Sequence, residues 1–64
     1  MNGIFVHNIR NLEDGVIAGW MARCVNYFQT EQDPDILDAS SRTYNALEEE
    51  LIRRGYYKNP NNSL

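Results

Sequence analysis

Cysteine and histidine are nearly absent from this chain, which contains one of each, Cys24 and His7, among 64 residues. One cysteine excludes a disulfide within the chain, and one cysteine with one histidine is too few for a Cys/His zinc site. A domain this short buries only about 60% of its unfolded surface. It usually needs a disulfide, a metal or association to be stable. The support that this sequence leaves open is association, with a second copy or with a larger protein.

Positive charge and long apolar runs are also scarce. Six Lys and Arg stand against nine Asp and Glu, for a net charge of −3. Binding driven by phosphate neutralisation needs clustered cations, so we expect no direct binding to nucleic acid. No apolar run approaches the roughly 20 residues that cross a bilayer, and the first residues do not resemble a signal peptide. A lone cysteine suits a reducing compartment. We therefore expect a cytoplasmic protein that makes no membrane contact.

The segment from Leu12 to Phe28 carries the strongest pattern. Residues spaced for one line along a helix are Ile17, Met21, Cys24 and Phe28. Trp20 and Tyr27 flank this line on one side, next to Val16, and Val25 flanks it on the other. The apolar arc covers about half of the helix, more than the stripe of an ordinary surface helix. Such a face needs more than one neighbour.

This helix is expected to begin at the N-cap Asn11, with Asp14 placed to satisfy first-turn amides, and to end near Glu31. Its back is a strip of small or polar side chains, Gly15, Ala18, Gly19, Ala22 and Asn26. Glycine costs about 1 kcal/mol relative to alanine inside a helix. Two interpretations fit the strip equally well: close contact with another helix, for example across a dimer, or a face exposed to solvent.

Asp33 and Pro34 mark the break between two helices, because Asp33 can cap a helix that has Pro34 at its first position. The second helix is predicted from Pro34 to about Arg54, with Gly55 just beyond its end and Glu48–Glu50 on its outer face. Its narrow apolar stripe, of coiled-coil type, consists of Leu37, Tyr44 and Leu51 with Ile36, Ser40 and Leu47 beside them. A connection this short makes the two helices antiparallel neighbours.

Residues 1–10 are open to two interpretations. Ile4–Val6 suit a short strand, but an isolated strand is not stable. The spacing of Phe5, Ile9, Leu12 and Val16 matches one helix face, which favours a short helix or an ordered arm that folds over the main helix. A β-arm exchanged between two protomers is the alternative. The polar residues 58–64 are predicted to form a disordered tail, which leaves a single helical domain at 1–57.

Catalytic and metal-binding chemistry has little support in the sequence. Cys24 lies in the middle of an apolar line, so we interpret it as a core thiol rather than a redox or catalytic group. The chain has no Glu-x-x-His pair and no EF-hand loop. Its carboxylates suit helix capping and a solvated face, or else an acidic surface that imitates phosphates for a nucleic-acid-binding protein. We therefore expect no enzyme, no cofactor and no bound metal.

Trp20-Met21-Ala22, Asp33-Pro34 and Tyr44 follow a pattern of three parts: a helix with a central Trp, an Asp-Pro break, and a second helix with a Tyr. In this the chain resembles short, uncharacterised helical-hairpin proteins of phages and prophages of Gram-positive bacteria. The resemblance covers roughly half of the chain and implies no catalytic residue. It implies a phage accessory factor that binds and inhibits a host protein.

Together these features predict an all-α, antiparallel two-helix hairpin with a short N-terminal helix or arm, which forms oligomers. A narrow stripe cannot cover a wide arc, and contiguous exposed apolar surface usually marks an interface. We expect the partner-binding residues to be Phe5, Val16, Trp20, Tyr27 and Tyr56. The predicted function is that of a non-enzymatic inhibitor or adaptor that docks on a larger host protein. The alternatives are a self-assembling scaffold and an acidic decoy, and the simplest assembly is a symmetric homodimer through the Trp20 flank.

Overall fold

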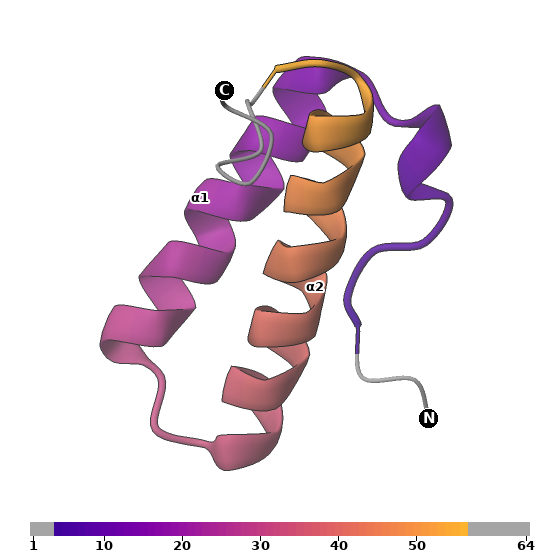
Figure 1. Ribbon diagram of the computed structural model, residues 1–64. Coiled ribbons are helices and arrows are strands. Elements are labelled where there is room, and N and C mark those ends of the chain that lie inside the picture. The colour runs from indigo at the N-terminus through magenta and orange to yellow at the C-terminus, as the bar shows by residue number, and fades with distance from the viewer. Residues whose placement is uncertain (1–3, 57–64) are drawn as a thin grey trace, which may run out of the picture.

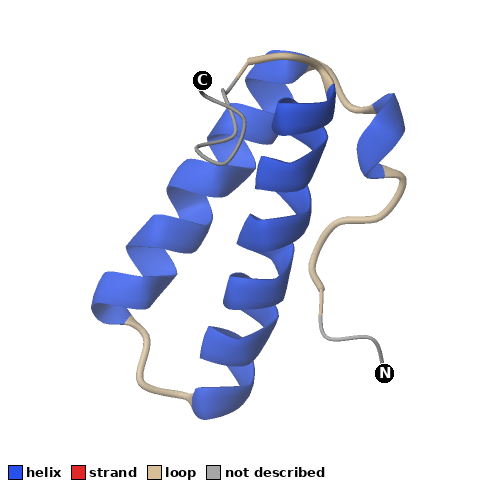
Figure 2. Cartoon of the chain, in the orientation of Figure 1, coloured by secondary structure: helices blue, strands red, loops and turns tan. Residues whose placement is uncertain are grey.

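The computed structural model of this protein describes residues 4–56. Two α-helices, α1 (Asp14–Thr30) and α2 (Pro34–Arg53), follow a single 3-10 turn, η1 (Ile9–Asn11). The two helices lie side by side and run in opposite directions, and the residues before α1 pass along α2 (Figure 1). Within residues 4–56 there is no strand, as Figure 2 shows. The predicted all-α hairpin is therefore confirmed.

The start and the end of α2 follow the local sequence signals. Asp33 Oδ1 accepts a hydrogen bond of 2.9 Å from the backbone N–H two residues later, and Pro34 occupies the first turn. At the other end Gly55 has a φ of 94°, which a residue with a Cβ rarely adopts. The N–H groups of Gly55 and Tyr56 donate back to carbonyls of the last turn, both at 3.0 Å. This pair of bonds is the Schellman motif that commonly ends a helix.

The start of α1 differs from the prediction. Asn11 belongs to η1, and the N-cap position is taken by Glu13, whose side chain makes no capping hydrogen bond. Asn8 has a left-handed φ of 57° and Leu12 is extended, so the backbone changes direction twice before α1 begins. The assignment of Asn11 as N-cap is therefore wrong.

The first residues contain one short helical turn, η1, but not the continuous helix face that the spacing of Phe5, Ile9, Leu12 and Val16 indicates. Phe5 lies in a stretch without helical structure, whereas Val16 lies on α1 and is exposed. Ile9 and Leu12 are half-buried and pack against the core from η1 and from the residue that follows it. Their regular spacing does reflect contact with the core, but it arises from an irregular segment and not from one helix face.

The core lies between the two helices and residues 4–12, which we call the N-terminal segment. Its buried apolar side chains are Val6, Ile17, Met21, Cys24, Leu47 and Leu51. Two hydroxyls, those of Ser40 and Thr43, are fully enclosed with them. Ser40 Oγ donates to the carbonyl one turn earlier in α2 at 2.8 Å, and Thr43 Oγ1 accepts from the Phe5 N–H at 2.9 Å. The second of these bonds fixes the N-terminal segment to α2.

Arg54 fixes the other end of the N-terminal segment. Its guanidinium donates to the carbonyl of Leu12 at 2.8 Å and to the carboxylate of Asp14 at 2.5 Å. It also donates to Glu50 at 2.7 Å, one turn earlier in α2. One arginine thus connects the end of α2 to the start of α1 and to the residues before it.

Glu50 lies on a different side of α2 from the one predicted. Its side chain is 6% exposed and accepts hydrogen bonds from both Arg53 and Arg54. The bonds from Arg53 first and from Arg54 second lower the pKa of this carboxyl to about 2. The placement of all three glutamates on an outer face is therefore wrong for Glu50, because it follows Thr43 by seven residues and shares its side of α2.

Candidate protein-interaction surfaces

Three aromatic side chains meet on one side of the hairpin. Phe5 stacks on Trp20 with 6.4 Å between ring centroids and an angle of 22° between the planes. The ring of Phe5 also meets Tyr27 at 5.8 Å and 57°. Phe5 is exposed, whereas Trp20 and Tyr27 are half-buried. We call these three rings the aromatic cluster.

Val16 and Arg23 extend the aromatic cluster along α1. The guanidinium carbon of Arg23 lies 5.0 Å from the centre of a Trp20 ring, which is the geometry of a cation–π contact. A shallow hollow of about 250 Å³ beside them is lined by Val16, Gly19, Trp20 and Arg23. Val16 itself is 43% exposed. Four of the five predicted partner-binding residues therefore lie together at this place.

Tyr56, the fifth predicted residue, lies elsewhere. Its hydroxyl donates to the Asp14 carboxylate, and this bond, with a second one from Arg54, lowers the pKa of Asp14. The same contact raises the pKa of the Tyr56 phenol. An open hollow of about 410 Å³ adjoins it, lined by Asp14, Gly15, Ala18, Leu51 and Tyr56. Tyr56 is 59% exposed and forms one wall of this second hollow.

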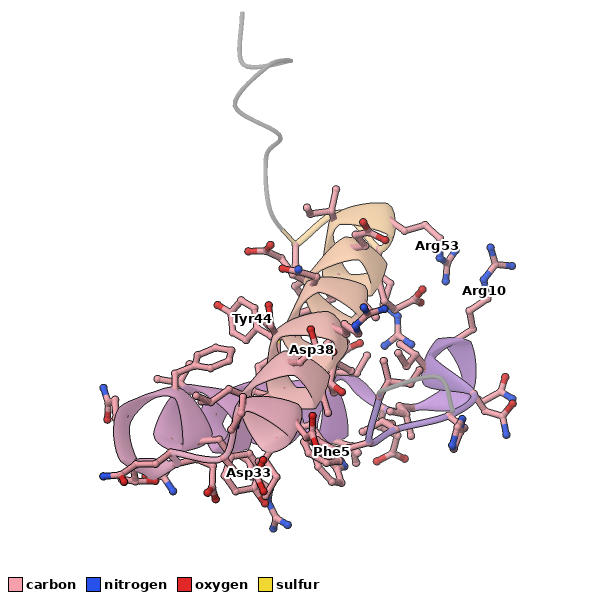
Figure 3. All side chains as sticks on the ribbon, turned by 90° about the horizontal axis from the view of Figure 1, so that it is seen from below. Phe5, Arg10, Asp33, Asp38, Tyr44 and Arg53 are labelled. Carbon is pink, nitrogen blue, oxygen red and sulfur yellow. The ribbon has the colours of Figure 1, made fainter. Side chains whose placement is uncertain are left out.

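The side of the hairpin that the N-terminal segment does not cover is also apolar. Phe28 is 42% exposed and meets the Tyr44 ring edge-on at 5.9 Å, while Val25 is 39% exposed. Figure 3 shows Tyr44 and Phe5 on different sides of α2. We call this surface the open face, and by helical spacing it comprises Ala18, Ala22, Val25 and Phe28 of α1 with Leu37 and Tyr44 of α2, next to the buried Leu51.

The open face was missed as a binding surface in the sequence. Phe28 continues the line of Met21 and Cys24 along α1, but in the structure it is exposed. Two signals pointed to this surface: Val25, which flanks that line on the side away from Trp20, and Ala18 and Ala22 of the small-residue strip. The glycines of the small-residue strip are open too: a Cβ added to Gly15 or Gly19 would meet nothing within 4 Å.

Within residues 4–56, the other reactive groups include a thiol and several carboxylates. Cys24 is fully buried, and burial raises the pKa of its thiol, which opposes formation of the thiolate. In the part of the chain from residue 4 to residue 56, no three His, Cys, Asp or Glu side chains are grouped so that they could hold a metal ion. Nor does this part contain a helix with the length and apolar character needed to cross a membrane.

Neither a family model, nor a curated protein, nor a solved structure matches this chain. The resemblance to phage helical-hairpin proteins therefore stays a prediction. The functional argument depends on the two surfaces of the hairpin and on the groups that they expose.

Proposed function

We propose that this chain is a small, acidic, non-enzymatic interaction factor that docks on a larger protein through the aromatic cluster and the adjoining Val16 and Arg23. The observation that carries this proposal is the packing of Phe5 and Arg23 against the half-buried Trp20. Trp, Tyr and Arg are the residue types that dominate binding energy at protein interfaces. Here all three types occur in one patch beside a shallow hollow.

The rigidity of this patch supports a binding role. The N–H of Phe5 is held by Thr43 Oγ1 at 2.9 Å, and its ring packs against both Trp20 and Tyr27. Side chains that are already ordered lose little conformational entropy when a partner covers them. A partner therefore gains contact area on the aromatic cluster without having to order it first.

The role we propose is that of an inhibitor or adaptor with a protein target, acting in the cytoplasm. The resemblance to phage hairpin proteins favours a host protein as that target. The buried free thiol of Cys24 favours a reducing compartment. In this proposal the N-terminal segment is the arm that supplies Phe5, so a target contacts this segment and α1 at the same time.

A self-assembling scaffold is the second candidate function, and the observation that favours it is the open face. Val25 and Phe28 are both exposed on a side of the hairpin opposite to the aromatic cluster. A protein with apolar surfaces on two opposite sides can join copies of itself in a chain or a closed ring.

Affinity capture from a host lysate tests the proposed function. The immobilised wild type is compared with Val16→Glu and Arg23→Glu, which alter the patch, and with Arg42→Glu as matched control. Arg42 has the same charge, is exposed, and contacts only Asp38 on the outside of α2. We expect a stoichiometric foreign partner with the wild type and with the control, and at least a tenfold loss with both patch variants. Self-association without a foreign partner, or equal capture by all four proteins, would refute the proposal.

A further inference from the structure

We propose that a second copy of this chain covers the open face, so that two hairpins form an antiparallel four-helix bundle about a two-fold axis. This interface is separate from the docking surface of the proposed function. The aromatic cluster lies on the other side of the hairpin, so both copies of it stay exposed in the dimer. The proposal follows from the charge, the shape and the size of the open face.

The charge of the open face suits an uncharged, apolar occupant. One of its two carboxylates, Asp14, already pairs with Arg54 and with the Tyr56 hydroxyl. The other, Glu48, lies at the rim by helical spacing. Figure 3 shows Arg10 and Arg53 on the side of α2 away from Tyr44. Arg54, which pairs with Asp14 at one end of the face, also pairs with Glu50, so its charge is already balanced.

The shape of the open face is complementary to itself. The exposed Phe28 packs edge-on against the half-buried Tyr44 toward the loop between the helices, a pair that we call the ridge, and the hollow of about 410 Å³ lies toward the other end. Phe28 follows Ala18 by ten residues, which places the ridge about 15 Å from the hollow along α1. A two-fold axis perpendicular to the helices, passing near Ala22, puts the ridge of each copy into the hollow of the other. The contact closes on itself and ends at two copies.

The size of the open face also suits a dimer. The 17 residues of α1 span about 26 Å, and two packed helices present a surface about 20 Å wide. Each copy would contribute on the order of 500 Å², and the pair about 1,000 Å², which is where specific interfaces begin. The dimer would also supply the additional buried surface that a 64-residue chain without disulfides usually needs.

A dimer through the Trp20 flank, as the sequence suggests, is the competing arrangement. In the structure that flank is already packed against Phe5 of the same chain, whereas Val25 and Phe28 have no such cover from the N-terminal segment. Val16 and Val25 separate the two arrangements. They lie on the same helix with 43% and 39% exposure, one beside Trp20 and the other on the open face.

Sedimentation equilibrium from low to high micromolar concentration is the test, with Val25→Glu and Val16→Glu as the matched pair. We expect the wild type and Val16→Glu to be dimers and Val25→Glu to dissociate at least a hundredfold more readily. Circular dichroism checks that each variant keeps its helix content. Ala22→Arg, which introduces a large side chain near the axis, is a second variant expected to give monomers. A wild type that is monomeric at high micromolar concentration, or that forms assemblies larger than a dimer, would overturn the proposal.

The reverse pattern, with Val16→Glu monomeric and Val25→Glu dimeric, would place the interface on the Trp20 flank and also overturn the proposal. Capture of a foreign partner is scored separately, because it depends on Val16 and Arg23 whatever the mass of the free protein. Glu48 tests the antiparallel orientation of the two copies. It lies midway between Tyr44, in the ridge, and Leu51, in the hollow, and therefore near the proposed two-fold axis, where it would face Glu48 of the other copy. Glu48→Gln should tighten the dimer severalfold, whereas Glu49→Gln on the outer face should not. Weaker association of Glu48→Gln would contradict the antiparallel arrangement.

Discussion

Two buried hydroxyls in α2 allow a sharp test of what holds the N-terminal segment in place. Thr43 and Ser40 are both 0% exposed, but they do different things. Thr43 Oγ1 is the acceptor for the Phe5 N–H at 2.9 Å, across 38 positions of sequence. Ser40 Oγ donates to the Ile36 carbonyl, which is an ordinary acceptor within the same helix. Removal of the Thr43 hydroxyl therefore leaves a backbone donor without its partner.

We expect Thr43→Val to lower the free energy of unfolding by about 1 kcal/mol. A buried donor that loses its acceptor costs about 1–3 kcal/mol. The low end applies because Phe5 is 38% exposed and water can reach part of it. Ser40→Ala leaves no backbone donor without a partner, so it should lower the free energy of unfolding by less than about 0.5 kcal/mol. Thr43→Ser keeps the acceptor and loses one methyl group, which costs about 0.5–1.5 kcal/mol through the cavity that it leaves.

Urea unfolding gives these free energies, and amide hydrogen exchange at Phe5 identifies their origin. Thr43→Val should reduce the protection of the Phe5 amide about fivefold or more, since 1 kcal/mol corresponds to that factor. Thr43→Ser keeps the acceptor, so protection of its Phe5 amide should fall no more than its global stability in urea falls. If Thr43→Val kept both the wild-type stability and the protection of the Phe5 amide, the hydrogen bond would not be what fixes the segment.

Three further predictions follow from particular groups. Glu50 has a pKa of about 2 in the folded protein against an ordinary value of 4.5, so the unfolded chain binds more protons between these values. Stability should be fully present above about pH 4.5 and decrease as the pH falls toward 2, and Glu50→Gln should flatten this decrease in urea titrations at pH 6, 4 and 3. Gly55→Ala should destabilise the folded protein by about 1–2 kcal/mol because of its positive φ, whereas Gly19→Ala, in open space, should stabilise it by up to about 1 kcal/mol. Thermal melts compare the two variants. A loss of stability with Gly19→Ala would show that the small-residue strip packs closely against another helix. Cys24 should react with an aromatic disulfide reagent only at the rate of unfolding, so fast labelling in the absence of urea would contradict its burial.

The hairpin was predictable from sequence because its signals are local. Asp33 and Pro34 act within one turn of the helix that they start, and Gly55 acts within one turn of the helix that it ends. The apolar line of α1 is likewise a property of spacing along one helix, and Ile17, Met21 and Cys24 are buried as it predicts. None of these features depends on where a distant segment packs.

What the sequence could not show depends on which side of the hairpin the N-terminal segment occupies. The spacing of the apolar residues around Asn8 fits a helix and gives no sign of its left-handed backbone, so this spacing favours a helical interpretation of the segment. Glu48, Glu49 and Glu50 are identical in type, and Glu50 is enclosed because it shares a side of α2 with Thr43 and bonds to Arg53 and Arg54. Phe28 continues an apolar line but stays exposed, since the segment covers the opposite side.

The candidate site was predictable in composition more than in geometry. Val16, Trp20 and Tyr27 share one flank of α1 by helical spacing alone, and the structure places them there. The contacts of Trp20 and Tyr27 with Phe5 are long-range contacts that no pattern within α1 encodes. Tyr56 was grouped with them by residue type, but its hydroxyl contacts Asp14 beside a different hollow.

The bonds of Arg54 to residues near the start of the chain have a consequence for biosynthesis. Its partners Asp14 and Leu12 are 40 and 42 positions earlier in the sequence. Trp20 and Tyr27 are therefore synthesised well before Arg54, which follows α2 and holds the N-terminal segment in place. Contacts this distant in sequence form late because the intervening loop must close first. Until Arg54 has been synthesised, α1 lacks the bonds that hold the N-terminal segment against the end of α2.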